Sequence, residues 1–202
     1  MNRITHFAAA LAAGLLVAAG SAAQDDENPQ QPDTYVIGED GEATHKATGA
    51  VCPVSMAELQ LVQVLSIDRE NEHLGVVCQY QSALGFDATL SFLRVDEPGL
   101  VGAGDSAARW NRSLYTILGS YPGALPANVE GLEGDAASGM RGALFTANAN
   151  GIPVRVGLWQ MEQGEWQFSA QTTFAPTGAE PWALAAATRS ALLAAKAAAD
   201  AS

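Results

Sequence analysis

The chain has 202 residues, of which 48% are apolar and 16% are charged, a balance typical of one globular domain with a core of ordinary size. Acidic residues outnumber basic ones by 22 to 10, so the net charge is −12. Such a surface repels the phosphates of nucleic acids and of anionic lipids, and binding to either is not expected.

The first 23 residues have the pattern of a secretory signal peptide. Arg3 supplies the basic start, an apolar run follows over residues 4–20, and residues 21–23 are small enough for signal peptidase. Cleavage is predicted before Gln24, and no cysteine follows the apolar run to carry a lipid anchor. We therefore predict a bacterial periplasmic or secreted protein without stable membrane insertion. Retention through an uncleaved segment is the alternative.

Residues 24–47 are predicted to form a flexible acidic tether, because they contain Pro29 and Pro32 and lack apolar periodicity. A short strand at 35–37 is the exception allowed within it. Ordered packing is expected from Thr48 onward. The sequence thus predicts a single domain over residues 48–202.

Three strands and a helix are predicted for the first half of this domain. The strands cover 59–67, 74–80 and 88–95, and the first two are joined by a polar turn. A helix is predicted after them because apolar residues recur at spacings of three and four, with Asp105 or Ser106 as its N-cap. These residues are Ala107, Trp110, Leu114, Ile117 and Leu118.

The second half repeats this order. Residues 121–138 are predicted to be a long irregular connection, followed by a strand at 141–147 and a hairpin at 152–174. A three-residue loop of Glu162, Gln163 and Gly164 is expected in the hairpin, because it sets Leu158 opposite Phe168. An alanine-rich helix is predicted over 180–199.

The predicted fold is therefore α+β, with three strands, a helix, three strands and a second helix. We expect an antiparallel sheet of about six strands with both helices packed on one face. The other face would be polar and wet, with one large aromatic residue near solvent. A binding surface for a peptide or small ligand is predicted there; the alternative is that the long connection or the tether covers it. Its residues are Arg155, Trp159, Met161, Gln167 and Gln171.

Cys52 and Cys78 are the only cysteines, and a disulfide between them is expected in an exported protein. It would contribute about 3 to 4 kcal/mol by constraining the unfolded chain. Two buried thiols are the alternative. A metal or redox role is not expected, because the spacing is not C-x-x-C and the mature chain has too few histidines for a zinc site.

No catalytic constellation is found. Gly104-Asp105-Ser106 is similar to the nucleophile block of the GDSL esterases, but that family needs a downstream histidine and the last one here is His73. The turn from Asp68 to His73 alternates oxygen ligands as a calcium loop does, without the required glycine, so a solvated turn is expected. His45 is predicted to be exposed, and Arg109 to form an exposed ion pair with Asp105. We expect no cofactor and no metal.

Three segments carry a resemblance to known proteins. Residues 45–53, 76–80 and 89–92 resemble a group of uncharacterised bacterial envelope proteins, and the order of elements is similar to the Mog1/PsbP-like fold. The resemblance covers about half of the chain. It implies a non-enzymatic assembly or binding role and provides no catalytic residue to transfer.

The sequence therefore predicts an exported, non-enzymatic binding or assembly module of the bacterial envelope. Its partner would be an envelope protein, a peptide or a small ligand. Two alternatives stay open. One is a hydrolase that pairs two carboxylates across a cleft, and the other is a purely structural envelope protein with no small ligand.

Overall fold

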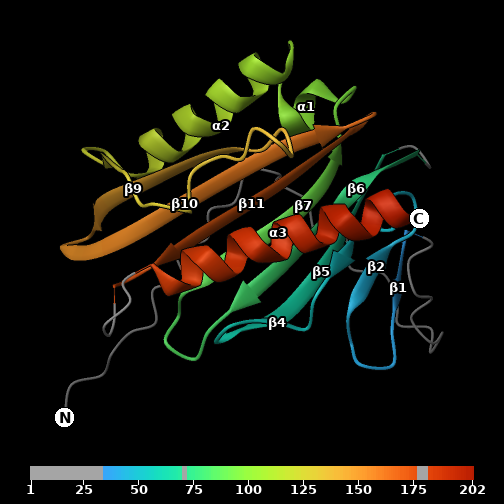
Figure 1. Ribbon diagram of the computed structural model, residues 1–202, viewed down its shortest axis with the longest axis horizontal. Coiled ribbons are helices and arrows are strands. Elements are labelled where there is room, and N and C mark those ends of the chain that lie inside the picture. Colours follow the sequence, from blue (N-terminus) through green and yellow to red (C-terminus); the bar gives the residue numbers. More distant parts are fainter. Residues whose placement is uncertain (1–33, 70–71, 177–181) are drawn as a thin grey trace, which may run out of the picture. The chain divides into compact units, whose positions relative to one another are not determined.

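The computed structural model describes residues 34–69, 72–176 and 182–202. The predicted signal peptide, residues 24–33 of the predicted tether and the start of the last predicted helix lie outside the described residues. The described part is a mixed α+β protein with antiparallel sheets and three helices (Figure 1). Within it, no helix has the length and apolar character needed to span a membrane.

The larger sheet consists of two meanders that meet at its centre. Its strand order is β4-β5-β6-β7-β11-β10-β9-β8, so β7 pairs with β11. The six predicted strands are present, and the two additional ones are the short edge strands β4 and β8. The bounds are β4 Ser55–Met56, β5 Leu59–Arg69, β6 Glu72–Gln81, β7 Asp87–Arg94, β8 Leu125–Ala127, β9 Arg141–Ala149, β10 Ile152–Gln163 and β11 Trp166–Phe174.

A small second sheet precedes the large one. It consists of β1 (Tyr35–Ile37), β2 (Ala43–His45) and β3 (Val51–Cys52) in that order. Ala43 and His45 are only 1% exposed, so packing begins before Thr48 and the predicted tether reaches too far along the chain. Strands of two or three residues are too short to produce a periodic sequence pattern, which explains the error.

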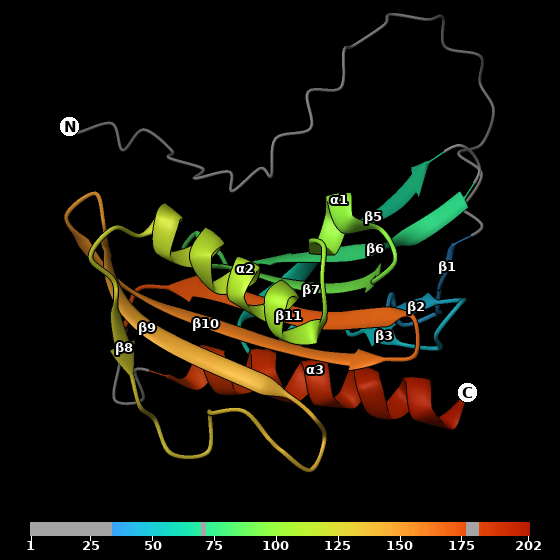
Figure 2. The ribbon, with the colours of Figure 1, turned by 90° about the horizontal axis from the view of Figure 1, so that it is seen from above.

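Three helices accompany the sheets: α1 (Pro98–Val101), α2 (Ser106–Ser120) and α3 (Ala183–Ala201). The side chain of Asp105 accepts a hydrogen bond from the Ala108 N–H at 2.9 Å, which confirms Asp105 as the predicted N-cap. Figure 2 shows α2 and α3 on opposite sides of the large sheet. The prediction that both helices cover one face is therefore wrong.

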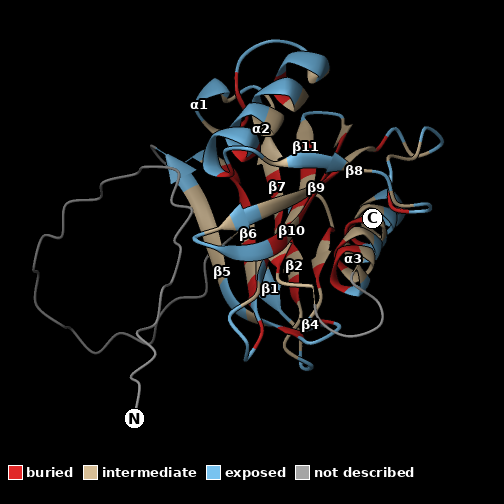
Figure 3. Cartoon of the chain, turned by 90° about the vertical axis from the view of Figure 1, so that its left-hand side faces the viewer, coloured by how far each residue is buried: buried red, intermediate tan, exposed pale blue. Residues whose placement is uncertain are grey.

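Each face of the large sheet has its own apolar core (Figure 3). On the side of α3, which we call the α3 face, the core is large and includes Trp159, Phe168 and Leu192. On the side of α2, the α2 face, a smaller cluster joins Ile117 and Tyr121 to residues of β9 and β10. The expected wet face of the sheet is consequently buried.

The hairpin of β10 and β11 turns through two residues, and the predicted three-residue loop is wrong. Gln163 pairs with Trp166 and Trp159 with Ala170, which leaves Gly164 and a glutamate in the turn. Gly164 has φ +57°, as the first position of a tight two-residue hairpin requires. This register places Trp159 on the α3 face. Because β10 is buried on both sides, it is apolar at both parities, and its pattern could not select the register.

Candidate functional site

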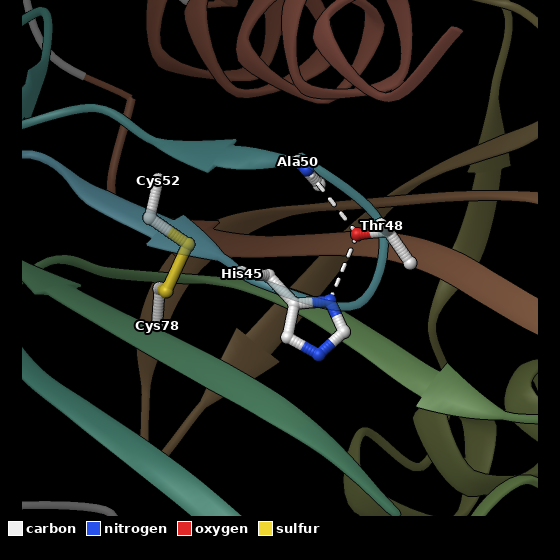
Figure 4. The surroundings of a disulfide bond; sticks show 5 residues. All are labelled: His45, Thr48, Ala50, Cys52 and Cys78. Carbon is white, nitrogen blue, oxygen red and sulfur yellow. Dashed lines mark hydrogen bonds between the residues drawn. A yellow bond between two sulfur atoms is a disulfide. The ribbon is translucent and has the colours of Figure 1, made fainter. Parts of the chain in front are cut away.

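A disulfide joins the small sheet to the large one. Cys52 of β3 and Cys78 of β6 are bonded, with Cα atoms 6.4 Å apart, as the sequence predicted (Figure 4). Both residues are buried. The end of the small sheet is thereby attached covalently to an interior strand of the large sheet.

His45, at the end of β2, is buried among aromatic rings and is not exposed as predicted. It is 1% exposed. Its ring centroid lies 4.8 Å from that of Trp166, 5.0 Å from that of His73 and 6.1 Å from that of Phe92. Figure 4 shows its Nδ1 turned toward Thr48 in the β2–β3 turn, 2.8 Å from Oγ1.

A continuous chain of hydrogen bonds runs from the small sheet through β6 and β5 and back. The two histidines face each other with their Nε2 atoms 2.8 Å apart. Nδ1 of His73 lies 2.9 Å from Oδ1 of Asp68, whose other oxygen accepts from Ser66. The chain closes on the small sheet because Thr34 donates to Ser66 at 2.9 Å. We call this set the histidine clasp: Thr48, His45, His73, Asp68, Ser66 and Thr34.

The partners of the clasp fix the direction of every hydrogen bond when both rings are neutral. A carboxylate only accepts, so Nδ1–H of His73 donates to Asp68 and Nε2 of His73 is an acceptor. Nε2–H of His45 therefore donates to His73, and Nδ1 of His45 accepts from the Thr48 hydroxyl. All donors thus point along the chain toward one carboxylate.

A β-bulge in β6 directs His73 toward His45. Ile67 pairs with Gly75 and Asp68 with His73, so Leu74 is an extra residue in the strand. Regular alternation would place His73 on the face opposite Cys78, and the extra residue reverses this. Gly75 has φ +149°, and a Cβ there would collide with the backbone of β7. Glycine is therefore required for this geometry.

The environment keeps the ring of His45 neutral. Burial, together with the charge of His73, lowers the pKa of His45 from 6.5 to about 4. Burial alone raises the pKa of Asp68, but hydrogen bonds from Ser66 and His73 outweigh it and hold the pKa below its ordinary value. At neutral pH the ring of His45 is therefore uncharged, whereas the carboxyl group of Asp68 is ionised.

The clasp links a hydroxyl, two imidazole rings and a carboxylate, so a second ring separates His45 from the carboxylate, unlike the order hydroxyl, imidazole, carboxylate that hydrolases use to activate a nucleophile. The Thr48 hydroxyl donates to His45 and also accepts from the Ala50 N–H at 3.2 Å, so it is held within the β2–β3 turn. Within the described ranges, no group of three potential metal ligands is found. The arrangement joins the two sheets through hydrogen bonds.

The residues predicted as a binding surface do not lie together. Trp159 is 0% exposed and donates from Nε1 to the carbonyl oxygen of Leu132 at 2.8 Å, so the long connection covers it, as the alternative proposed. Met161 is buried beside it, and Arg155 lies over the ring of Trp182 at 5.4 Å. By the β10–β11 pairing, these three lie on the α3 face: Arg155, Trp159 and Met161. Two lie on the α2 face: Gln167 and Gln171.

The inner side of α2 is fastened to the sheet by polar contacts. Arg109 is 8% exposed and binds Glu162 of β10 through two bonds, of 2.8 Å and 2.6 Å. Ser113 donates to Gln160 at 3.2 Å. The predicted exposed pair of Arg109 with Asp105 is therefore wrong, because Asp105 caps the helix and the guanidinium turns inward. The hydrogen bond from Arg109 to Glu162 raises the pKa of the guanidinium, which stays charged.

The outer side of α2 carries exposed side chains over a shallow, open depression. Tyr115 is 74% exposed. A Cβ at Gly102 would collide with the Arg112 side chain, so the glycine lets Arg112 lie against the loop after α1. We call this set the α2 outer surface: Ala108, Asn111, Arg112, Tyr115 and Thr116.

Several acidic residues that a carboxylate-based hydrolase could use are bound to arginines. Glu72 and Asp96 both bind Arg94. Glu162 binds Arg109 in the same way. The hydrogen bond from Arg94 holds the pKa of Asp96 below its ordinary value. Each of these acids is therefore engaged in an ion pair with an arginine.

Sequence reasoning missed the histidine clasp because its rings are 28 residues apart and belong to no motif. The one usable signal was Gly75 inside an otherwise apolar strand, since such a glycine often marks a bulge. The bulge alone does not identify the partner of His73. That contact depends on how the small sheet folds back.

Comparison of the chain with models of known protein families, with curated proteins and with solved structures finds no match. The resemblance to bacterial envelope proteins and to the Mog1/PsbP-like order of elements stays a prediction. The function is therefore inferred from the described residues themselves.

Proposed function

We propose that this protein is an exported, non-enzymatic module of the bacterial envelope that binds a partner polypeptide through the α2 outer surface. The observation that carries the proposal is Tyr115, which is 74% exposed on a helix whose other side is fixed to the sheet. Tyrosine and arginine are the residues that most often dominate binding energy at protein interfaces. Tyr115 and Arg112 line the same depression.

The rigidity of α2 supports this role. Arg109 and Ser113 are bonded to β10, and Trp110 and Ile117 pack in the core of the α2 face. These contacts fix the rotation of the helix about its axis. A surface that is already ordered loses little conformational entropy when a partner binds.

The charge of α2 indicates the kind of partner. The protein has 22 acidic residues, yet none lies within Ser106–Ser120. Arg112 therefore stands on a helix without carboxylates, in a protein that is otherwise strongly acidic. A partner segment with a carboxylate beside an apolar side chain would match Arg112 and the tyrosine ring.

The proposed location is supported by two features. Residues 1–23 have the pattern of an export signal, and the chain uses both of its cysteines in a disulfide. Disulfides persist in oxidising compartments such as the periplasm and are rare in the cytosol. An envelope location also fits the resemblance of residues 45–53 to envelope proteins.

The proposal is tested by titrating the isotopically labelled protein with short peptides that contain a glutamate next to a phenylalanine or leucine. We expect amide shifts over residues 108–116, and a loss of affinity of at least tenfold in Tyr115→Ala and in Arg112→Gln. Leu84→Ala is the control, because Leu84 is 68% exposed and lies in the turn between β6 and β7. If no peptide shifts these amides, or if Tyr115→Ala binds as well as Leu84→Ala, the α2 outer surface is not the binding site.

A further inference from the structure

The small sheet is attached to the large one by packing of Ala43, Ala50 and Cys52 in the core of the α3 face, and by a small set of bonds. Cys52 is bonded to Cys78, and the Ser202 hydroxyl donates to the carbonyl oxygen of Thr48 at 3.1 Å, which ties the β3 end to α3. The β1–β2 end is tied by the histidine clasp. Val36 and Ile37 of β1 are 45% and 41% exposed, so this strand buries little apolar surface.

The clasp tolerates no additional proton. If His73 is protonated, its only free position is Nε2, and two N–H groups then point at each other across 2.8 Å. If His45 is protonated, the proton enters at Nδ1, and the Thr48 hydroxyl must rotate to accept from it. The positive charge would also be buried next to Phe92 and Trp166. The first event breaks the bond between the sheets, and the second destabilises the closed state through a buried charge.

Other groups around the clasp do not offset such a charge. Facing His45 are His73 from β6 and the uncharged rings of β7 and β11, and Asp68 of β5 lies behind His73. Lys46 follows His45 in the chain and is exposed. At the same end of the sheet, Glu72 and Asp96 are already bound to the guanidinium of Arg94. No carboxylate is bonded directly to the ring of His45 within the described residues.

We propose that the histidine clasp is a pH-operated latch: acidification breaks the His45–His73 bond and releases β1 and β2 from the large sheet, while the disulfide keeps β3 attached. Opening uncovers the rings of Phe92 and Trp166, on which His45 is packed. The protein would then present a second, aromatic surface only under acidic conditions. The lowered pKa of His45 is consistent with this order of events, since the closed state resists the proton and the open state accepts it.

The experiment measures amide hydrogen exchange in the full, disulfide-bonded chain between pH 7.5 and pH 4.5, with rates divided by those of unstructured peptides at each pH. We expect protection over residues 35–45 to fall at least tenfold and reversibly, while protection over 154–162 and 167–174 is retained. Constant protection over 35–45 would overturn the proposal. A simultaneous fall in all three segments would do the same, because it indicates global unfolding in acid.

The decisive variant is His73→Gln, because the glutamine side chain can accept from His45 and donate to Asp68 but cannot be protonated. We expect its opening midpoint to move at least one pH unit lower. Glu72→Gln is the control, because it removes a neighbouring charge and leaves the two rings in place. Its opening midpoint should shift by less than about 0.3 pH unit. An unchanged midpoint in His73→Gln would contradict the latch.

A second measurement on the unaltered chain does not depend on the folding of a variant. Imidazole ¹⁵N shifts at pH 7.5 should show His45 protonated at Nε2 and His73 protonated at Nδ1. Both rings should then change at the pH at which residues 35–45 lose protection. Other tautomers, or titration of the rings without opening, would count against the proposal.

Discussion

On the α3 face of the large sheet, Trp159 belongs to the same core as a helix whose buried positions are mostly alanine and leucine, whereas on the α2 face Arg109 and Ser113 fasten the helix through polar bonds. Small side chains let α3 lie close to the strands and bury a continuous apolar area. α2 covers a smaller cluster. The comparison indicates that the α3 face provides most of the stability, whereas the α2 face fixes the orientation of α2.

The largest effect is expected from truncating the aromatic residue at the centre of the α3 face. Trp159→Ala should lower the free energy of unfolding by about 3 to 5 kcal/mol, because it leaves a cavity and removes the bond to Leu132. Trp110→Ala is the matched variant on the α2 face, where the ring is only partly buried, and should cost clearly less. Guanidinium denaturation measures both. Equal costs would show that the two faces contribute equally.

The next largest effect is a pH dependence of stability, which is expected from His45 of the histidine clasp. The pKa of His45 is about 4 in the folded protein and 6.5 in the unfolded chain, so the unfolded state binds the proton first. Stability is therefore complete above pH 6.5 and is lost as the pH falls toward 4, by up to about 3 kcal/mol. Unfolding free energies across this range should fall less steeply in His45→Gln. Parallel curves would contradict the assignment.

A smaller effect is expected from the ion pair on the α2 face. Glu162→Gln should cost about 2 kcal/mol, because Arg109 is left without its charged partner in a mostly buried site. The double variant Arg109→Met with Glu162→Leu should cost less than the sum of the two single variants, since no unpaired charge remains. A double-mutant cycle by urea denaturation provides the test. Simple additivity would indicate that the pair does not hold α2.

The smallest effect is expected on the outside of α2. Tyr115→Ala should change the free energy of unfolding by less than about 0.5 kcal/mol, because the side chain is 74% exposed. Thermal unfolding followed by circular dichroism measures this. A large loss of stability would mean that Tyr115 serves the fold, and its proposed role in binding would lose its main support.

Much of the fold could be predicted from local patterns. The central strands, α2 and its Asp105 cap follow from periodicity and capping chemistry, and the disulfide follows from the two cysteines and the export signal. The face of the sheet on which each side chain of β10 lies could not be predicted. β10 is apolar at Val156 and Leu158 as well as at Trp159, so a two-residue and a three-residue turn fit its pattern almost equally well.

The candidate sites were less predictable, because each depends on contacts between distant segments. Arg109 turns inward because Glu162 lies near the end of β10 beneath it, 53 residues later in the chain. His45 is buried because three aromatic or imidazole rings from the large sheet surround it. Neither the helix that contains Arg109 nor the short strand that contains His45 shows this in its own sequence.

The edge strands of the large sheet also affect whether copies of the chain associate at high concentration. β4 has two residues and β8 has three, and Pro126 in β8 has no N–H with which to pair an incoming strand. Pairing of an incoming strand is therefore hindered at the β8 margin, whereas β4 covers only Leu59 and Gln60 of β5. The proline in its short edge strand protects this one margin of the sheet against fibrous aggregation.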